Sequence, residues 1–453
     1  MDFRTERDSM GEIEVENDKY WGAQTERSRR NFTIGELMPS ELIRALAEVK
    51  LAAARANARL LPEKMTAEKL RAIELAAGEI ISGVLDSHFP LRVYQTGSGT
   101  QTNMNVNEVI ARRAGELSGL SLHPNDDVNM SQSSNDVFPT AMHIAAARGT
   151  MKLSSELSAL SALFKRLEDE NRGVIKCGRT HLQDATPIAF SDEVSGWRSS
   201  VEYGIQMLGS ATAQLMRIAL GGTAVGTGLN APRGFAELAT EELSKITGMP
   251  LSSDGNKFHG LSSKSELVFA HGALKAVAAD LMKIANDIRH LASGPRCGLG
   301  EIKIPENEPG SSIMPGKVNP TQCEAVTMVA ARVMGNDATV GFAASQGNFE
   351  LNVFMPVIID AYLESVRLLC AAVRSFGERC VSGIVANREK MNENLHRTLM
   401  TATALNPYIG YENTAKMVKL AHEYNITLSE AAVKLGILTA EKFDEIYHPE
   451  LMI

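Results

Sequence analysis

Apolar residues recur at helical spacing through most of the chain. The longest such stretches are residues 40–86, 135–171, 191–220 and 262–293. Positions three and four apart share one face of an α-helix, so this spacing gives each predicted helix an apolar stripe. Residues 40–86 divide into two amphipathic helices near Leu61-Pro62, because proline breaks a helix. The pattern predicts a mainly α fold.

Residues 351–378 are apolar nearly all round. A helix of this kind is buried on several sides. Several long helices in one chain therefore predict a central helical bundle, packed with other subunits into a tetrameric multi-helix core. Near the N-terminus, residues 11–15 alternate between polar and apolar side chains like a short strand.

The character of the pattern changes twice along the chain. Residues 1–40 are polar and irregular, and from about 395 the helical stretches become shorter and more polar. We therefore expect three domains. They are an N-terminal domain at 1–133, a central helical-bundle domain at 134–394 and a small helical domain at 395–453.

Composition fits this prediction and excludes some functions. Of 453 residues, 44 % are apolar, 22 % charged and 5 % aromatic, which is typical of a globular chain with packed helices. The net charge of −8 argues against non-specific nucleic-acid binding. No window holds 18 uninterrupted apolar residues, so no membrane span is expected.

The five cysteines are scattered and form no CxxC pair, which indicates reduced thiols in a cytosol-like compartment. The first residues contain no apolar segment of a signal peptide and are too acidic for a transit peptide. A cytoplasmic location follows as an expectation. Since no His or Cys cluster has metal-ligand spacing, neither a metal nor an organic cofactor is predicted.

One proline- and glycine-rich stretch combines flexibility with reactive side chains. Residues 310–320 read GSSIMPGKVNP and form a predicted loop. Asn319 is placed at the N-cap of the next helix and Pro320 at its first position. The positive end of that helix and Lys317 can hold an anion, which suggests chemistry on a carboxylate or phosphate. The alternative is an ordinary surface loop with a helix cap.

Three further polar stretches interrupt the helices. Residues 96–105 are rich in Gly, Ser and Thr, and residues 131–136 place serines before a long helix. Both are also explained as turns and caps, and a helix is expected to start near Asn103. His181 lies in a polar break, where it is either a structural histidine or a proton-transfer group.

These stretches together resemble a known enzyme family. TGSGTQTNMNVNEV at 96–109, GRTHLQDATP at 178–187 and GSSIMPGKVNP at 310–320 resemble, in order, the signature regions of the fumarase/aspartase superfamily. Gly316, where aspartases usually carry Ala, resembles the iron-independent fumarases. The chain departs from the pattern at Met130, where a lysine is usual, at Tyr408, where a His is common, and in the less usual segment 260–264.

The resemblance implies which residues form the site. Ser98 and Thr100 would contact a substrate carboxylate. The other substrate-binding positions are Ser133, Ser134, Asn135, Thr180, Ser312, Lys317, Val318 and Asn319. A secondary carboxylate site would comprise His123, Asn125 and Asp126. A metal site at His123, Asp126 and Asp127 is conceivable, but these residues lack the usual spacing of metal ligands, so none is predicted.

The implied reaction is the reversible anti-elimination of water from L-malate to give fumarate. Ser311 is assigned as the base, and His181, oriented by Glu324, would handle the leaving hydroxyl. The sequence leaves open a swap of these acid and base roles. The family also implies a homotetramer in which three subunits share each active site.

Two other functions remain as alternatives. An aspartate ammonia-lyase would release ammonia instead of water, although Gly316 disfavours it. A catalytically inactive structural relative is the second alternative, against which the intact Ser311, Lys317, Asn319 and His181 argue.

Overall fold

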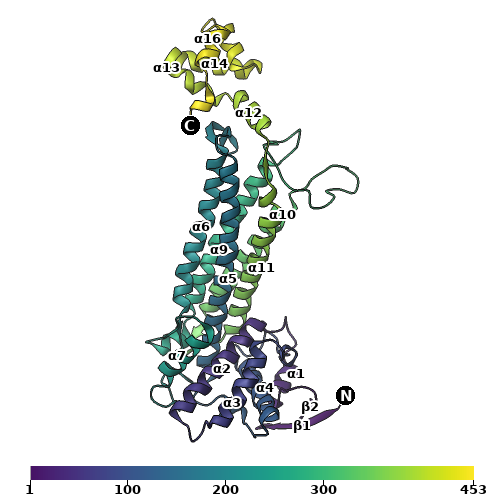
Figure 1. The fold of residues 1–453 in the computed structure, drawn as a ribbon, viewed down its shortest axis with the longest axis vertical. Coiled ribbons are helices and arrows are strands. Elements are labelled where there is room, and N and C mark those ends of the chain that lie inside the picture. The colour runs from purple at the N-terminus through teal and green to yellow at the C-terminus, as the bar shows by residue number, and fades with distance from the viewer. Residues whose placement is uncertain (1) are drawn as a thin grey trace. The chain divides into compact units, whose positions relative to one another are not determined.

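Helices dominate the computed structural model, which describes residues 2–453 (Figure 1). It contains sixteen α-helices, and the strands within the described residues pair only two by two. The prediction of a mainly α fold is confirmed. Five of the helices are much longer than the others: α5 (Ser134–Glu170), α6 (Phe190–Leu215), α9 (Ser265–Leu291), α10 (Thr321–Ala344) and α11 (Met355–Arg379).

The N-terminal part begins with an antiparallel hairpin of β1 (Phe3–Asp8) and β2 (Gly11–Glu16), which confirms the predicted strand. Four helices follow: α1 (Ala23–Asn31), α2 (Ser40–Leu60), α3 (Ala67–Ile81) and α4 (Thr100–Ser118). The predicted break near Leu61-Pro62 is therefore correct. Helix α3 packs against both α2 and α4, so the apolar faces read from the sequence cover one another.

Short elements connect the long helices. The helices are α7 (Phe235–Thr247) and α8 (Lys257–Ser262). The strands are β3 (Ile175–Thr180), β4 (Gln183–Ala189), β5 (Arg217–Ile218), β6 (Ser252–Ser253), β7 (Ile302–Lys303), β8 (Gly347–Asn348), β9 (Leu351–Asn352) and β10 (Val385–Ala386). The sequence predicts a helix from residue 351, but residues 351–352 pair with β8 and α11 begins at Met355.

The last part of the chain consists of short helices around a core of their own. They are α12 (Arg388–Arg397), α13 (Asn406–Ile409), α14 (Tyr411–Tyr424), α15 (Leu428–Lys434) and α16 (Ala440–Ile446). Leu405, Met417, Ala432 and Phe443 are buried in this cluster. Thr427 and Glu430 form a reciprocal capping box that fixes the start of α15.

The chain divides into two compact units, each built from several segments. The first comprises residues 1–155, 204–278 and 329–370, and the second comprises residues 156–203, 279–328 and 371–453. These units follow where the chain packs against itself, whereas the expected boundaries at 133 and 394 follow changes in the type of element. The three-domain organisation stays a proposal.

In the first unit, helices α9, α10 and α11 are joined by buried polar contacts. His271 Nδ1 lies 3.0 Å from Asp337 Oδ1, and its Nε2 lies 2.9 Å from Ser365 Oγ. Thr150 Oγ1 on α5 lies 2.7 Å from Tyr362 Oη. These groups satisfy one another in an apolar surrounding, which fixes the relative rotation of the helices.

In the second unit, an aromatic cluster joins α5, α6 and α9. Trp197 is buried between Phe164 and Phe190, with ring centroids 6.0 and 6.3 Å away. Its indole N–H donates to Asp287 Oδ2 at 3.0 Å, so the one polar group of the side chain is satisfied.

Candidate functional site

The signature loop is closed at its neck. The Asn319 side-chain amide donates to the Gly310 carbonyl at 2.5 Å. A Cβ on Gly310 would lie 1.9 Å from the Lys317 carbonyl oxygen, so only glycine permits this approach of the two backbone segments. Gly316 has a φ of +79°, a conformation that glycine adopts without strain. The segment between 310 and 319 thus resembles a compact Ω-loop.

The loop presents its predicted substrate-binding side chains toward solvent. Ser312 and Lys317 are exposed, and Ser311 is half-buried, with its hydroxyl accepting a 3.3 Å hydrogen bond from the Ile313 N–H. Helix α10 begins at Thr321, one residue later than the sequence predicts, directly after the segment in which Asn319 bonds Gly310. Glu324 lies in the first turn of α10 and is exposed.

His181 lies at the tip of a β-hairpin that the sequence analysis did not predict. Strands β3 and β4 pair antiparallel, and His181 and Leu182 form the two-residue turn between Thr180 and Gln183. Both turn residues have positive φ, 57° and 61°, which is uncommon for non-glycine residues. The hairpin holds His181 exposed at its end. Backbone strain of this kind is often found at functional sites.

A buried carboxylate anchors this hairpin. Glu301, 0 % exposed, accepts two hydrogen bonds from Arg179 at 2.6 and 3.0 Å and lies 3.1 Å from the Lys176 ammonium. Asn394 on α12 donates to it at 2.9 Å. Burial alone would raise the pKa of Glu301, but the Arg179 hydrogen bonds and the Lys176 charge hold that pKa below its ordinary value. Arg179 is two residues before His181, so this ion cluster anchors the hairpin close to its tip.

Replacing Glu301 should therefore destabilise the protein strongly. Glu301→Ala removes the acceptor of both Arg179 hydrogen bonds and one of the two carboxylates beside Lys176, which keeps Glu193 at 2.7 Å, and breaking a buried ion pair costs about 3–5 kcal/mol. We expect a clear fall in the thermal midpoint, measured by circular dichroism. The matched control is Glu393→Ala on α12, whose carboxylate pairs with Lys390 and Arg397 at the surface and should cost about 1 kcal/mol or less. Equal shifts for both variants would contradict the anchoring role of Glu301.

Three of the predicted substrate-binding residues are joined by a chain of hydrogen-bonded hydroxyl groups. Ser98 Oγ lies 2.8 Å from Thr100 Oγ1, which lies 2.8 Å from Ser134 Oγ. Helix α4 begins at Thr100 and not near Asn103, because Gly99 adopts a φ of +72° directly before it. A Cβ on Gly97 would lie 1.4 Å from the Val353 carbonyl oxygen, so glycine is required for this turn. The structure thus brings the first and second polar stretches together.

Asp136 organises the start of α5 beside these hydroxyls. Its carboxylate accepts from the Ser133 N–H at 2.9 Å and from the N–H groups of Gly221 and Thr223 at 2.8 and 3.0 Å. Asn135 donates its side-chain amide to the Ala224 carbonyl at 2.8 Å. Two N–H groups of the glycine-rich turn after Leu220 are thereby taken by a carboxylate of the same chain, which does not fit a phosphate-binding role for this turn.

The predicted secondary site is an exposed turn. His123 Nδ1 accepts the N–H groups of Asn125 and Asp126 at 3.3 and 3.2 Å, and lies 3.4 Å from Asp126 Oδ2. Asp127 caps the same turn through the His123 N–H at 2.8 Å and binds Lys69 at 2.7 Å. These contacts leave the His123 Nε2 edge and the Asn125 side chain at the surface.

The sequence-predicted residues fall into two groups. Ser98, Thr100, Ser133, Ser134 and Asn135 belong to the first unit, as does the His123 turn. Thr180, His181 and all the signature-loop residues belong to the second. Within the part of the chain that the structure describes, no hydrogen bond joins His181 to Glu324, so the orienting role of Glu324 stays a proposal.

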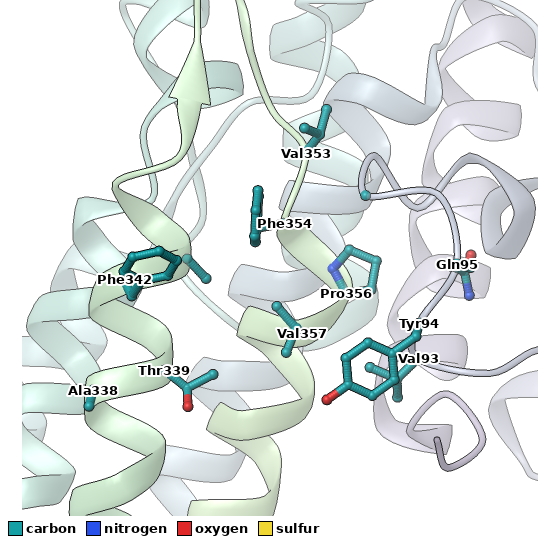
Figure 2. A pocket seen from close by; sticks show the side chains of 12 residues that line it. Val93, Tyr94, Gln95, Ala338, Thr339, Phe342, Val353, Phe354, Pro356 and Val357 are labelled. Carbon is teal, nitrogen blue, oxygen red and sulfur yellow. The ribbon is translucent and has the colours of Figure 1, made fainter. Parts of the chain in front are cut away.

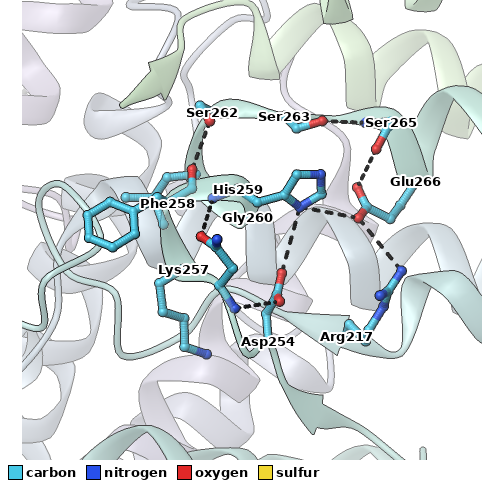
Figure 3. Close-up of polar contacts among 12 residues, drawn as sticks. Arg217, Asp254, Lys257, Phe258, His259, Gly260, Ser262, Ser263, Ser265 and Glu266 are labelled. Carbon is cyan, nitrogen blue, oxygen red and sulfur yellow. Dashed lines mark hydrogen bonds and ion pairs between the residues drawn. The ribbon is translucent and has the colours of Figure 1, made fainter. Parts of the chain in front are cut away.

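The less usual segment 260–264 lies between His259 and Glu266, whose polar contacts are shown in Figure 3. Lys264, 1 % exposed, donates to the carbonyl oxygens of Gly260, Leu261 and Ser263 at 2.8–3.0 Å. It therefore satisfies carbonyls at the C-terminal end of α8. His259 lies 3.7 Å from Glu266 and 3.9 Å from Asp254 at the surface of the same segment.

An apolar groove of about 580 Å³ opens in the first unit (Figure 2). Three segments line it, within residues 93–97, 338–343 and 353–357. Phe342 is 67 % exposed and Tyr94 is 52 % exposed. Large aromatic side chains on an open face are typical of a surface that contacts another protein.

No helix within residues 2–453 is both long and apolar enough to span a membrane. Over the same residues, no three His, Cys, Asp or Glu side chains are grouped as ligands for a metal ion.

Comparisons with known proteins agree over the whole length. Residues 11–335 match the family model described as Lyase, and residues 402–453 match that of the Fumarase C C-terminus. The class II fumarate hydratases of Bacillus subtilis and Helicobacter pylori are each 56 % identical, and each alignment covers 100 % of this chain and 99 % of the relative.

Solved structures give the same result. The class II fumarase of Schistosoma mansoni is 42 % identical, with a TM-score of 0.96 and coverage of 100 % of this chain and 99 % of that one. The fumarate lyase:delta crystallin of Brucella melitensis, bound to cobalt, is 42 % identical with a TM-score of 0.95, covering 99 % of each chain. This chain belongs to the lyase family, and within it to the class II fumarate hydratases.

Proposed function

We propose that the chain catalyses the reversible addition of water to fumarate, giving L-malate, with Ser311 and His181 as the acid–base pair. Its substrate is a small dicarboxylate, as in the rest of the family. The observation that carries the proposal is the full-length likeness to class II fumarate hydratases, together with the presence of every signature side chain.

The difficult step is the removal of a proton from the carbon next to a carboxylate. The resulting carbanion survives only if its charge moves onto that carboxylate and is stabilised there. Lys317 supplies a full positive charge on the signature loop, and Asn319 and the N-terminal end of α10 lie directly after it. The Ser98, Thr100 and Ser134 hydroxyls are suited to bind the second carboxylate.

A base and an acid must then act on opposite faces of the substrate, since the elimination is anti. Ser311 is the base in this proposal, activated when its loop closes and excludes water. His181, with Thr180 beside it, handles the hydroxyl group, and Glu324 orients it. Ser312 and Val318 complete the binding surface of the loop. No cofactor takes part.

The working form is a homotetramer in the cytoplasm, in which three subunits contribute to each active site. The groove that exposes Phe342 and Tyr94 supports this proposal, because an apolar surface of this kind is usually covered by a partner. In that assembly a second chain supplies the Glu324 that His181 lacks in its own chain. His123, Asn125 and Asp126 form the secondary carboxylate site.

The activity is tested by assaying purified protein with fumarate, L-malate and L-aspartate while following the absorbance of fumarate. Turnover of L-malate without turnover of L-aspartate is the expected result. Conversion of L-aspartate instead would identify an ammonia-lyase, and no turnover of either would identify a structural relative.

Shared active sites are tested by mixing two inactive variants. Ser311→Ala and His181→Asn subunits should each be inactive as separate tetramers. After mixing under conditions that exchange subunits, hybrid tetramers contain some sites with both wild-type side chains, so activity should reappear. Hybrids that form, as shown by native mass spectrometry, but stay inactive would contradict the sharing of Ser311 and His181 between chains.

A further inference from the structure

One buried lysine stands close to the proposed carboxylate-binding residues. Lys50 lies in the middle of α2 and is 0 % exposed. Its ammonium donates to Asn129 Oδ1 at 2.8 Å and to Gln132 Oε1 at 3.0 Å. Placing a cation inside a protein is costly, and a methionine would fill much of the same space without this cost. The contacts of the lysine therefore need an explanation other than packing.

Both acceptors of Lys50 belong to the segment that leads into α5. This segment, residues 129–133, is irregular, and Ser131 has a φ of +64°. Asn129 donates to the Gln132 carbonyl at 3.3 Å, and Gln132 donates to the Met130 carbonyl at 3.0 Å. Because a serine in the left-handed region is strained, outside contacts must hold the segment in this conformation.

Helix α2 supplies these outside contacts at two places. Asn57, two turns after Lys50, donates to the Met130 carbonyl at 2.9 Å, and Ser131 donates to Asn57 Oδ1 at 2.8 Å. Residues seven apart lie on the same face of a helix. Lys50 and Asn57 thus form one polar face of α2 against which the segment lies.

Helix α4 also contacts the Asn129 side chain. Asn103 and Asn107, one turn apart, both donate to Asn129 Oδ1 at 3.2 Å. The oxygen that accepts from Lys50 therefore also accepts from the helix that begins with Thr100. Through this oxygen, the lysine connects the two chain segments that supply the hydroxyls of Thr100 and Ser134.

Asp136 holds the other end of the segment and is the charged group that faces Lys50. It is 0 % exposed and accepts the Ser133 N–H at 2.9 Å. Burial raises the pKa of Asp136, and the charge of Lys50 opposes this effect. Two buried groups therefore fix the segment that contains Ser133, Ser134 and Asn135. Lys50 holds the residues before Ser133, and Asp136 holds the residues at its C-terminal end.

We infer that Lys50 is a positioning residue, which fixes the Ser133–Asn135 segment through Asn129 and Gln132 so that it can bind a substrate carboxylate. This inference rests on the proposed function of that segment. Lys50 acts through other residues and has no contact with substrate. Removing its ammonium should therefore weaken ground-state binding more than it slows the chemical step.

The test is Lys50→Met in the full-length protein, assayed for fumarate hydration. Losing these hydrogen bonds lowers the population of the segment conformation that binds substrate, so KM should rise about 10- to 100-fold while kcat changes less. The matched control is Lys264→Met, which removes an equally buried lysine whose acceptors are backbone carbonyls at the end of α8. This control should leave KM within about twofold of the wild-type value, since a tenfold change requires about 1.4 kcal/mol.

A double variant shows whether Lys50 acts through this segment. Asn135→Ala should raise KM by itself, and adding Lys50→Met should raise it by much less than the product of the two single effects, because both changes disturb one element. If Lys50→Met does not fold, Gln132→Met removes one of the two acceptors and serves in the same comparisons.

Several results would overturn the inference. They are an unchanged KM in Lys50→Met, equal effects of Lys50→Met and Lys264→Met, or independent effects of Lys50→Met and Asn135→Ala. In each case the wild-type enzyme would still hydrate fumarate. Failure of the proposed function differs, because the wild-type protein itself would then show no turnover of fumarate or L-malate.

Discussion

Replacing Ser311 by alanine should reduce kcat about 10²- to 10⁴-fold, the usual contribution of a general acid or base. The hydroxyl accepts a single long hydrogen bond of 3.3 Å from the Ile313 N–H, so its removal changes little in the resting loop. The tetramer and its thermal midpoint should therefore match those of the wild type. Since the hydroxyl is needed for the chemical step, KM should change much less than kcat.

The control for this variant is Ser382→Ala. The Ser382 hydroxyl also has one local partner, the Glu378 carbonyl at 2.8 Å at the end of α11, and is remote in sequence from the signature loop. Its kcat should equal that of the wild type. Full activity in Ser311→Ala would remove this serine from the mechanism and leave His181 as the first candidate for the base.

The helices could be predicted closely from sequence because their periodicity is a local signal. The pattern at 135–171 corresponds to α5 at Ser134–Glu170. The predicted first residues of two helices, α4 and α10, differ from those in the structure. Helix α4 begins at Thr100, earlier than the predicted start near Asn103, after Gly99 in the left-handed conformation, and α10 begins at Thr321, after the segment closed by Asn319.

The hairpin that carries His181 could not be predicted from its sequence. Two-residue turns are usually recognised by Asn-Gly or Asp-Gly, whereas this turn contains His181 and Leu182 with positive φ. The pairing of β3 with β4 and the anchoring by Glu301 hold a conformation that the turn residues disfavour. Tertiary contacts here override local preference.

Buried charges were the other features that sequence analysis missed. Lys50 lies within an amphipathic helix, where a lysine normally marks the solvated face. Its burial depends on packing against residues 129–132, about eighty positions later in the chain. The one sequence feature that indicates burial of Lys50 is that its two neighbours, Val49 and Leu51, are apolar.

The second large effect is expected from Gly310→Ala, which acts on the neck of the signature loop. The new Cβ would lie 1.9 Å from the Lys317 carbonyl oxygen and 3.3 Å from the Asn319 nitrogen. Neither is the end of a flexible side chain, so the two backbone segments must separate and the Asn319–Gly310 hydrogen bond must break. A displacement of about 1 Å can cost about 100-fold in rate, and kcat/KM should fall by this amount.

Two glycine controls separate the neck from general effects of adding a methyl group. Gly316→Ala lies in the same loop with open space around its Cβ, and its φ of +79° should cost about 1–2 kcal/mol of strain without opening the neck. Gly335→Ala lies within α10 with no atom within 4 Å, and should be neutral or slightly stabilising.

Since Ile313 at the loop tip is 82 % exposed, opening the neck exposes little apolar surface, so the thermal midpoint of Gly310→Ala should stay near that of the wild type. If Gly310→Ala were as active as Gly335→Ala, a closed neck would not be required for catalysis, and Ser311 and Lys317 would have to reach the substrate from an open loop.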